Sequence, residues 1–453
     1  MVFRICLIIE LLLLCLFYPL PGQESTSHNA KWNGYFQTDN RIRLKGNNEF
    51  SWEEYRLSLK GETNPGEKAH FYSEIWLRTL GFSTLKNSSD LGSKDKISPL
   101  NLELREVYID FYGFLFNNLD VRIGKQRIAW GVADKLNPTD NLNPDDLEDI
   151  WDFGRHLGSN GLRSSYYLGD WTFTGVYIPH FTPSVLPRGN WASLFSSIIQ
   201  LPSGLVLRNS TDTIIMPKNN PKESSIMGGK ISKNLFDYDF SLSYVYGRDD
   251  LPLARKVTFI PTDTPGEIDI ATELIYPKIQ IVGMDFAGAL GSFGIWAEAA
   301  VFFPEKVNLT TDLSALGMGI QESIVLDDNP YVKYVLGTDY TFKNGIYINI
   351  QYLHGFIHER GKDNLEDYFM FGVERKLLDD KIKITPLAGG IEIKDLKDIK
   401  NNYALILSPE ATYYPLEDAE ITLGIRWIDG KNTTNFGRIK ENDELFLKIK
   451  YYF

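Results

Sequence analysis

Seven carboxylates are concentrated in one short polar segment, residues 131–157, which we call the acidic segment. Lys135 and Arg155 are its only lysine and arginine. Carboxylates at this density attract cations, and they can bind a divalent ion or set the electric field of a narrow passage. The carboxylates of the acidic segment are Asp134, Asp140, Asp145, Asp146, Glu148, Asp149 and Asp152.

Basic side chains fall on the polar faces of the strands that we expect near the amino terminus. An acidic segment facing this basic wall across a lumen would create a strong transverse field, which orders water, disfavours apolar solutes and lets small hydrophilic solutes pass. The alternative is an acidic segment outside the fold, solvated or binding divalent cations that bridge lipopolysaccharide. The residues of the predicted basic wall are Arg41, Arg43, Arg56, Lys60, Arg78 and Arg122.

The acidic segment differs from a calcium-binding loop of the EF-hand type. Asn141, Asn143 and Asp145 stand at alternate positions, as ligands of such a loop would. However, Asp146 replaces the glycine that the loop requires, and no helices are expected on either side. We therefore expect no specific metal site here.

Catalytic chemistry has little support in the sequence. His354 and His358 are four residues apart in a predicted strand, which separates their Cα atoms by roughly 13 Å, too far to share one metal. Cys6 and Cys15 are the only cysteines, and both lie in the predicted leader. The mature chain would therefore have no thiol for catalysis or metal binding. We expect neither an enzyme nor a cofactor.

The carboxy-terminal residues LFLKIKYYF alternate strictly. Leu445, Leu447, Ile449, Tyr451 and Phe453 share one apolar face, and the opposite face carries both lysines. A buried last strand of a soluble β-sandwich would also alternate. An amphipathic strand that ends on a terminal Phe, however, resembles the signal by which bacterial outer-membrane barrels are recognised for insertion. The resemblance implies an assembly signal at Ile449, Tyr451 and Phe453 and the barrel-assembly machinery as a partner.

The amino terminus has the layout of a signal peptide. Arg4 precedes an apolar run over residues 5–20, and residues 21–23 offer a cleavage point, so we expect a signal peptide at residues 1–22. Lipidation at Cys15 is an alternative, but Leu14 stands where a small residue is wanted. Only about ten residues then precede the first strand near residue 33. We expect residues 23–453 to form a single barrel domain without an amino-terminal plug.

Short turns rich in Gly, Asn, Asp or Pro separate paired amphipathic segments. Together with the first and last strands they predict about eighteen strands, with sixteen possible if the strands around 367–394 are misassigned. Long polar connections near 131–157, 183–223, 249–273 and 304–329 alternate with the turns. The predicted turns are 61–66, 113–118, 168–170, 234–237, 289–292, 343–345, 377–380 and 415–418.

These patterns predict an all-β fold, a transmembrane antiparallel β-barrel with short periplasmic turns and long extracellular loops. An even number of strands would leave both termini in the periplasm. No apolar run after residue 22 approaches the length of a spanning helix, and the aromatic content of 13% suits two interfacial girdles. The net charge of −12 argues against nucleic acid as a partner.

The strand VRIGKQRIAWG and the acidic segment that follows it resemble a region of porin-like outer-membrane barrels. The third loop of general porins folds into the barrel and narrows it. The resemblance implies passive diffusion of small hydrophilic solutes in a bacterial outer membrane, with lipid and lipopolysaccharide as surroundings. The alternatives are a channel selective for carboxylates, sugars or polysaccharide, and a non-conducting barrel that binds a partner through its long loops. The sequence predicts no oligomeric state.

Overall fold

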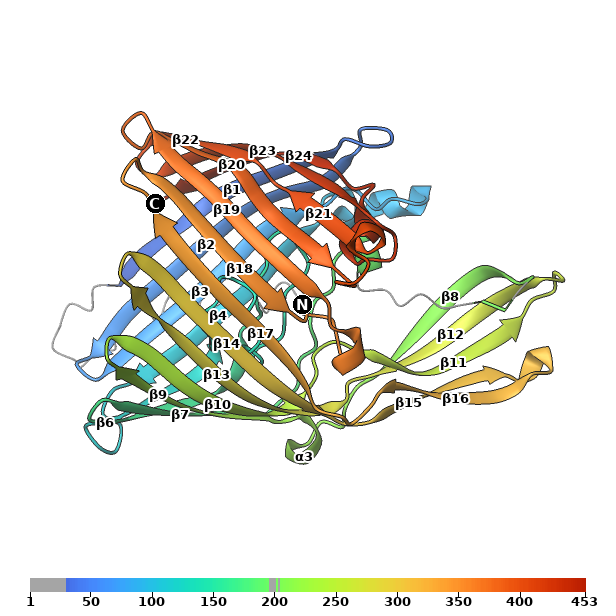
Figure 1. Ribbon diagram of the computed structural model, residues 1–453, viewed down its shortest axis with the longest axis horizontal. Helices are drawn as coiled ribbons and strands as arrows, with labels where there is room; N and C mark the ends of the chain where they lie inside the picture. The colour runs from blue at the N-terminus through green and yellow to red at the C-terminus, as the bar shows by residue number, and fades with distance from the viewer. Residues whose placement is uncertain (1–29, 195–200, 203) are drawn as a thin grey trace.

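The computed structural model describes residues 30–453 apart from 195–200 and 203, and one closed antiparallel sheet dominates it (Figure 1). The predicted signal peptide lies outside the described residues. The strands of the sheet are β1 Lys31–Arg43, β2 Phe50–Gly66, β3 Ala69–Leu80, β4 Leu100–Phe111, β5 Leu119–Gln126, β6 Ser159–Leu168, β7 Trp171–Ile178, β9 Ile226–Leu235, β10 Tyr238–Arg248, β13 Lys278–Leu290, β14 Phe293–Pro304, β17 Tyr331–Thr341, β18 Ile346–His354, β19 Asp367–Leu377, β20 Ile382–Ile393, β21 Tyr403–Leu407, β22 Glu410–Leu416, β23 Ala419–Gly430 and β24 Glu444–Tyr452.

The sheet closes because β1 pairs with β2 on one side and with β24 on the other. At the seam Gly34 and Phe453 exchange backbone hydrogen bonds of 3.0 and 3.1 Å. The short strands β21 and β22 both pair with β20 and with β23, so they occupy one position in the barrel. Pro409, which has no backbone N–H to donate, lies at the break between them. The nineteen strands of this sheet therefore form a barrel of eighteen positions, and the predicted fold class is confirmed.

The two ends of the barrel differ as predicted. Tight turns join successive strands at the end where the carboxy terminus lies, which we call the turn end (Figure 1). Long connections join the strands at the opposite end, the loop end. The first tight turn differs in position from the prediction. β2 continues to Gly66, so this turn lies at Glu67 and Lys68, later than the predicted 61–66.

The last strand presents its faces as predicted. Leu447, Ile449 and Tyr451 are exposed on the outer surface, whereas Phe446 is buried and Lys448 reaches Asp39 of β1 at 3.4 Å. Outside the barrel, an unbroken apolar stripe of this kind requires an apolar environment.

We expect Ile449→Arg to destabilise the barrel in lipid by roughly 2–4 kcal/mol if residue 449 lies at the bilayer midplane, because an arginine there faces hydrocarbon. Lys448→Arg keeps the charge beside Asp39 and should change stability by less than about 1 kcal/mol. Urea unfolding of both variants in lipid vesicles measures the difference. Equal losses from the two substitutions would contradict the assigned faces.

The long connections are not all irregular, which corrects their description as polar loops. Three of them, near 183–223, 249–273 and 304–329, contain strands that form a second sheet, which we call the wing and which extends beyond the loop end (Figure 1). Val257, Phe259, Ile268, Ile270 and Leu313 form its buried core. The wing consists of β16 Gly319–Leu326, β15 Val307–Leu313, β11 Leu253–Pro261, β12 Glu267–Ile275 and β8 Val206–Ile215, in this order across the sheet.

Helical structure among the described residues is confined to short turns in the connections. None of these helices is long and apolar enough to cross a membrane. They are η1 Ser88–Gly92, α2 Lys94–Ile97, η2 Gly189–Leu194, α3 Pro221–Ser224, η3 Ser314–Leu316, η4 Lys362–Asn364, η5 Ile399–Asn401 and η6 Phe436–Ile439.

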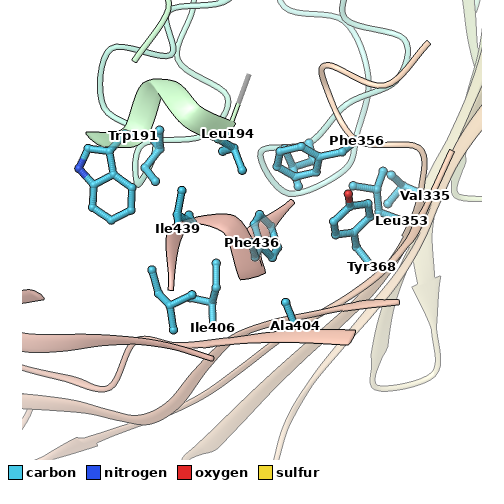
Figure 2. Packing of buried hydrophobic residues seen from close by; sticks show 13 residues of the cluster. Trp191, Leu194, Val335, Leu353, Phe356, Tyr368, Ala404, Ile406, Phe436 and Ile439 are labelled. Carbon is cyan, nitrogen blue, oxygen red and sulfur yellow. The ribbon is translucent and has the colours of Figure 1, made fainter. Parts of the chain in front are cut away.

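An apolar core fills part of the barrel interior and joins several connections to the wall. Figure 2 shows Trp191 and Leu194 of η2 facing Phe436 and Ile439 of η6, with Ile406 of β21 beyond them. The acidic segment contributes Leu136 and Ile150 to the same cluster. The connections at this level therefore pack as a folded plug and not as separate loops.

Candidate functional site

The acidic segment lies inside the barrel and contacts its wall on both sides. Towards the first strands, its residues contact Arg41 of β1 and Arg78 of β3. Towards the middle of the chain, its backbone contacts Glu298 of β14 and Gln351 of β18. A segment that joins such distant strands must cross the lumen.

Three carboxylates of the acidic segment form ion pairs with arginines of the wall. Asp149 accepts from Arg41 at 2.9 Å through Nη1 and at 2.5 Å through Nη2. Glu148 lies 2.5 Å from Nη2 of Arg78. All four side chains are buried, so these pairs are largely shielded from solvent.

A third pair joins Asp146 to Arg105 of β4 at 2.9 Å. Arg155 of the segment itself also contacts Asp146, at 3.0 Å through Nε. Arg105 was not among the predicted residues of the basic wall, although its position four strands from the amino terminus follows the same pattern. Asp146 is thus held by two guanidinium groups and is 2% exposed.

The remaining predicted carboxylates have different surroundings. Asp140 contacts Arg127, which also donates to Asn143. Asp145 accepts from Nε2 of His156 at 2.9 Å. Asp134 and Asp152 are exposed, and Asp152 lies 3.6 Å from Nη1 of Arg155.

The predicted basic wall divides into two groups. Arg41 and Arg78 bind the acidic segment, whereas the others are paired within the wall or lie at its rim. Arg56 pairs with Glu54 at 2.6 Å, Lys60 lies 3.9 Å from Glu74, and Arg122 lies 2.6 Å from Asp110. Arg43 lines a separate cavity near η6, beside Lys45 and Arg438.

The contacts correct the expected arrangement of charges. We expected carboxylates and basic residues to face each other across open water, but Asp146, Glu148 and Asp149 touch their arginines. Opposite charges at contact distance cancel most of the field that they would produce at a distance. The pairs therefore fix the position of the segment, and any field in the lumen must come from other side chains.

The pKa values of the segment follow from these contacts. Burial by itself raises the pKa of Asp149 and of Asp146. The guanidinium of Arg41 outweighs burial at Asp149, and those of Arg155 and Arg105 together outweigh it at Asp146, so both pKa values are lowered. Burial lowers the pKa of His156, but the hydrogen bond to Asp145 and the charges of Asp140 and Asp145 together outweigh burial and raise it. Asp146 and Asp149 are therefore ionised throughout the physiological range.

Glu298 of β14 was not predicted from the sequence, yet it holds the start of the acidic segment. Its Oε1 accepts from the backbone N–H of Val132 at 2.9 Å and of Ala133 at 2.6 Å. Its carboxylate also accepts from Nδ2 of Asn137 at 2.8 Å and from Oγ1 of Thr139 at 2.7 Å. A lone carboxylate in the otherwise apolar stretch IWAEAAVFF was the available signal.

A second buried carboxylate, Asp250, lies in the connection after β10. It accepts from the backbone N–H of Asp145 at 2.9 Å and from the hydroxyl of Ser184. Burial, followed by the charges of Asp145 and Asp249, raises the pKa of Asp250 to about 6. It therefore links the acidic segment to two other connections through a carboxyl that titrates near neutrality.

The pKa of Asp250 predicts a pH dependence. The folded chain binds this proton more tightly than the unfolded chain, so the contribution to stability is present below about pH 4 and is lost as the pH rises through 6. We expect Asp250→Asn to raise the free energy of unfolding, relative to the native chain, more at pH 7.5 than at pH 4.5. The difference between the two pH values should be on the order of 1 kcal/mol. Thermal unfolding in detergent at the two pH values measures it, and a pH-independent difference would contradict it.

A cavity of about 900 Å³ lies beside the acidic segment. The segment closes it on one side with Asp149, Asp152 and Arg155, and the barrel wall surrounds the rest. Nine lysines and arginines and seven aspartates and glutamates line it, so its charge is nearly balanced. The wall contributes Arg56, Arg105, Arg127, Lys383, Arg426, Lys448 and Lys450 together with Asp39, Glu74, Glu106, Glu410 and Glu420.

No metal centre is built by the described part of the chain. Within residues 30–194, 201–202 and 204–453 no group of three or more His, Cys, Asp or Glu side chains is placed to hold a metal ion. Nδ1 of His354, one of the two histidines noted in the sequence, donates to the carboxylate of Asp367 at 2.8 Å.

Comparison with known proteins gives no family assignment. No family model matches the chain, and no curated protein matches it. Solved structures of similar shape include Salmonella typhi OmpF in complex with daunomycin, at 10% identity and a TM-score of 0.40, with 94% of this chain and 98% of that chain covered. Pseudomonas aeruginosa OpdK with vanillate has 9% identity and a TM-score of 0.49, covering 94% and 98%. OmpT, an outer-membrane protein of Vibrio cholerae, has 8% identity and a TM-score of 0.44, covering 96% and 100%.

Proposed function

We propose that this chain is an outer-membrane channel for passive diffusion of small hydrophilic solutes. The observation that carries the proposal is the polar cavity of about 900 Å³ inside an eighteen-position barrel whose outer face is apolar. A barrel of this size encloses more space than its own side chains fill. The acidic segment occupies part of that space and leaves a charged passage beside it.

The composition of the cavity favours a general channel over a selective one. Cationic and anionic side chains line it in nearly equal number, and aromatic rings such as Tyr35, Trp76 and Trp151 line it too. Arg56 and Arg105 both stack on Trp76, at 4.0 and 4.2 Å from its centroid. Such a mixed lining solvates polar solutes of either sign without strong preference. A channel selective for carboxylates, sugars or polysaccharide remains the nearest alternative.

Current through purified protein in planar lipid bilayers tests the proposal. Lys450 lies on the cavity and stacks on Tyr35 and Tyr452 at 4.3 and 4.5 Å, so Lys450→Glu should shift the reversal potential towards cation preference. Asp152→Asn, at an exposed carboxylate on the same cavity, should shift it the opposite way. Lys397→Glu, in an exposed connection, is the matched control and should leave it unchanged.

The wing supports a second candidate function, a surface barrel that binds a partner. Within the described residues, its outer strands β8 and β16 each have one unpaired edge, and every residue of β8 is exposed. Unpaired edges can add a strand from another chain, and β8 contains neither the lysine nor the proline that often protects such edges. The bilayer experiment separates the two functions, because a protein that acts only through its wing passes no current.

We further propose that Ile449, Tyr451 and Phe453 are recognised during assembly and that the turn end faces the periplasm. All three side chains are on the outer surface and well exposed, so they are available at the free end of the chain. The seam hydrogen bonds with Gly34 show that Phe453 also helps to close the barrel. Outer-membrane yield after deletion of Phe453, compared with the melting of the purified deletion variant, distinguishes recognition from closure.

A further inference from the structure

The tips of the tight turns carry apolar side chains where polar ones are expected. Among the eight tight turns of the described barrel, six bear a leucine or phenylalanine that is more than half exposed. We call the most exposed such residue of each turn, six in all, the apolar ring, and it consists of Leu115, Leu168, Phe236, Leu290, Leu378 and Leu416.

Turn geometry does not explain two of these residues. Phe236 has a φ of 55° and Leu378 a φ of 54°, in the left-handed region that asparagine and glycine adopt readily and bulky side chains rarely adopt. Phe236 is also 91% exposed, so it packs little within the chain. A strained and exposed aromatic residue points to a contact made outside the chain.

The apolar ring continues the outer face of the barrel. Leu290 follows Val282 and Met284 at alternate positions of β13, and all three are exposed. Leu168 follows Leu162 and Tyr166 in the same way on β6. The outward face of these two strands therefore leads to the turn tips and ends there on an exposed leucine.

The distribution of the ring decides between a lipid and a protein as its occupant. Its members lie on turns from β4–β5 through β22–β23, and so occur around the barrel rather than in one sector. A docked protein would cover a sector, whereas a bilayer surrounds a barrel completely. We propose that the apolar ring inserts into the lipid leaflet on the turn side, so that the turn tips are anchored in lipid instead of projecting into water. This inference rests on the proposed outer-membrane location.

Single cysteines provide the test, because Cys6 and Cys15 are the only native cysteines and can be replaced with serine. In that background Leu115→Cys, Phe236→Cys and Leu378→Cys are labelled with a polarity-sensitive fluorophore and the full chain is reconstituted in phosphatidylcholine vesicles. Spin-labelled lipid should quench all three probes, and iodide present on both sides of the membrane should not.

Two further positions calibrate the measurement. Met284→Cys on the outer face should be quenched by spin-labelled lipid, and Met318→Cys at the turn before β16 of the wing should be quenched by iodide. If the three ring probes respond to iodide as strongly as the probe at 318, the inference is wrong. Quenching of only one of the three ring probes by spin-labelled lipid overturns the inference as well.

Current recorded from the same vesicles separates this inference from the proposed function. If the barrel conducts and its ring probes respond to iodide, the proposal that the ring inserts into lipid is wrong and the proposed channel function stands. If the barrel does not conduct and its ring probes are quenched by lipid, the proposed channel function is wrong and the insertion of the ring into lipid stands.

Discussion

Glu298→Ala is expected to release the start of the acidic segment and to make the channel current noisier and larger. The substitution removes the acceptor for the backbone N–H groups of Val132 and Ala133 and for the side chains of Asn137 and Thr139. A buried donor left without a partner costs about 1–3 kcal/mol, which applies in full to Thr139, whereas the other three donors are only partly buried. The start of the segment, which loses four hydrogen bonds, should therefore leave the wall, while the ion pairs of Asp146, Glu148 and Asp149 still hold its later part.

Single-channel recording and limited proteolysis measure this effect together. Mean conductance and open-state noise should rise, and the segment should become accessible to protease. Glu298→Gln keeps one acceptor oxygen in the same place and should have an intermediate effect. Glu305→Ala, seven residues later in the chain at an exposed carboxylate, is the matched control. Native conductance and protease resistance in Glu298→Ala would show that the ion pairs and apolar contacts of the segment suffice to hold its start.

The strand pattern was predictable because a barrel repeats one simple rule. Polar and apolar side chains alternate along each strand, and each tight turn needs particular residues. For β24 the alternation over nine residues was enough to predict which side chains face outwards. The eighteen positions follow from counting these units. Even the broken strand at Pro409 leaves the count unchanged, because its two halves pair with the same neighbours.

The wing was not predictable from the same rule. Its strands lie inside long connections, where β11 pairs with β12 and β15 pairs with β16 as antiparallel hairpins. The pairings that join these hairpins and β8 into one sheet, β12 with β8 and β11 with β15, link different connections, with partners 61 residues (Glu267 and Val206) and 54 residues (Lys256 and Thr310) apart. Both of these pairings are parallel, so no hairpin turn in the sequence indicates them. Only the alternation of Val257 with Phe259 and of Ile268 with Ile270 could have indicated buried strands.

The acidic segment was identified from its composition, but its contacts were not. The sequence shows how many carboxylates there are and not which cation each one meets, since the partners lie on strands that follow or precede by tens of residues. Arg41 and Asp149 are 108 residues apart. The sequence therefore predicted charges of both signs in the lumen. It did not predict that these charges form direct ion pairs instead of facing each other across water.

Asp149→Ala is expected to destabilise the folded barrel by about 3–5 kcal/mol, because it leaves part of the charge of Arg41 buried without its partner. Arg41 is 1% exposed and sits over Trp52 at 4.6 Å, so water cannot replace the lost carboxylate without reorganising the wall. Asp39 still accepts from Arg41 at 2.8 Å, which places the expected loss at the lower end of that range. Urea unfolding in lipid vesicles measures it.

The pair also allows a double-mutant cycle. Arg41→Met combined with Asp149→Leu fills the same space with apolar side chains, and buried pairs replaced in this way often leave stability unchanged or raised. Asp39 then keeps Lys448 at 3.4 Å as a cation partner. Asp152→Ala, at an exposed carboxylate 3.6 Å from Arg155, should cost less than about 1 kcal/mol. If Asp149→Ala costs no more than Asp152→Ala, the buried pairs do not hold the acidic segment, and its apolar residues in the barrel core must do so instead.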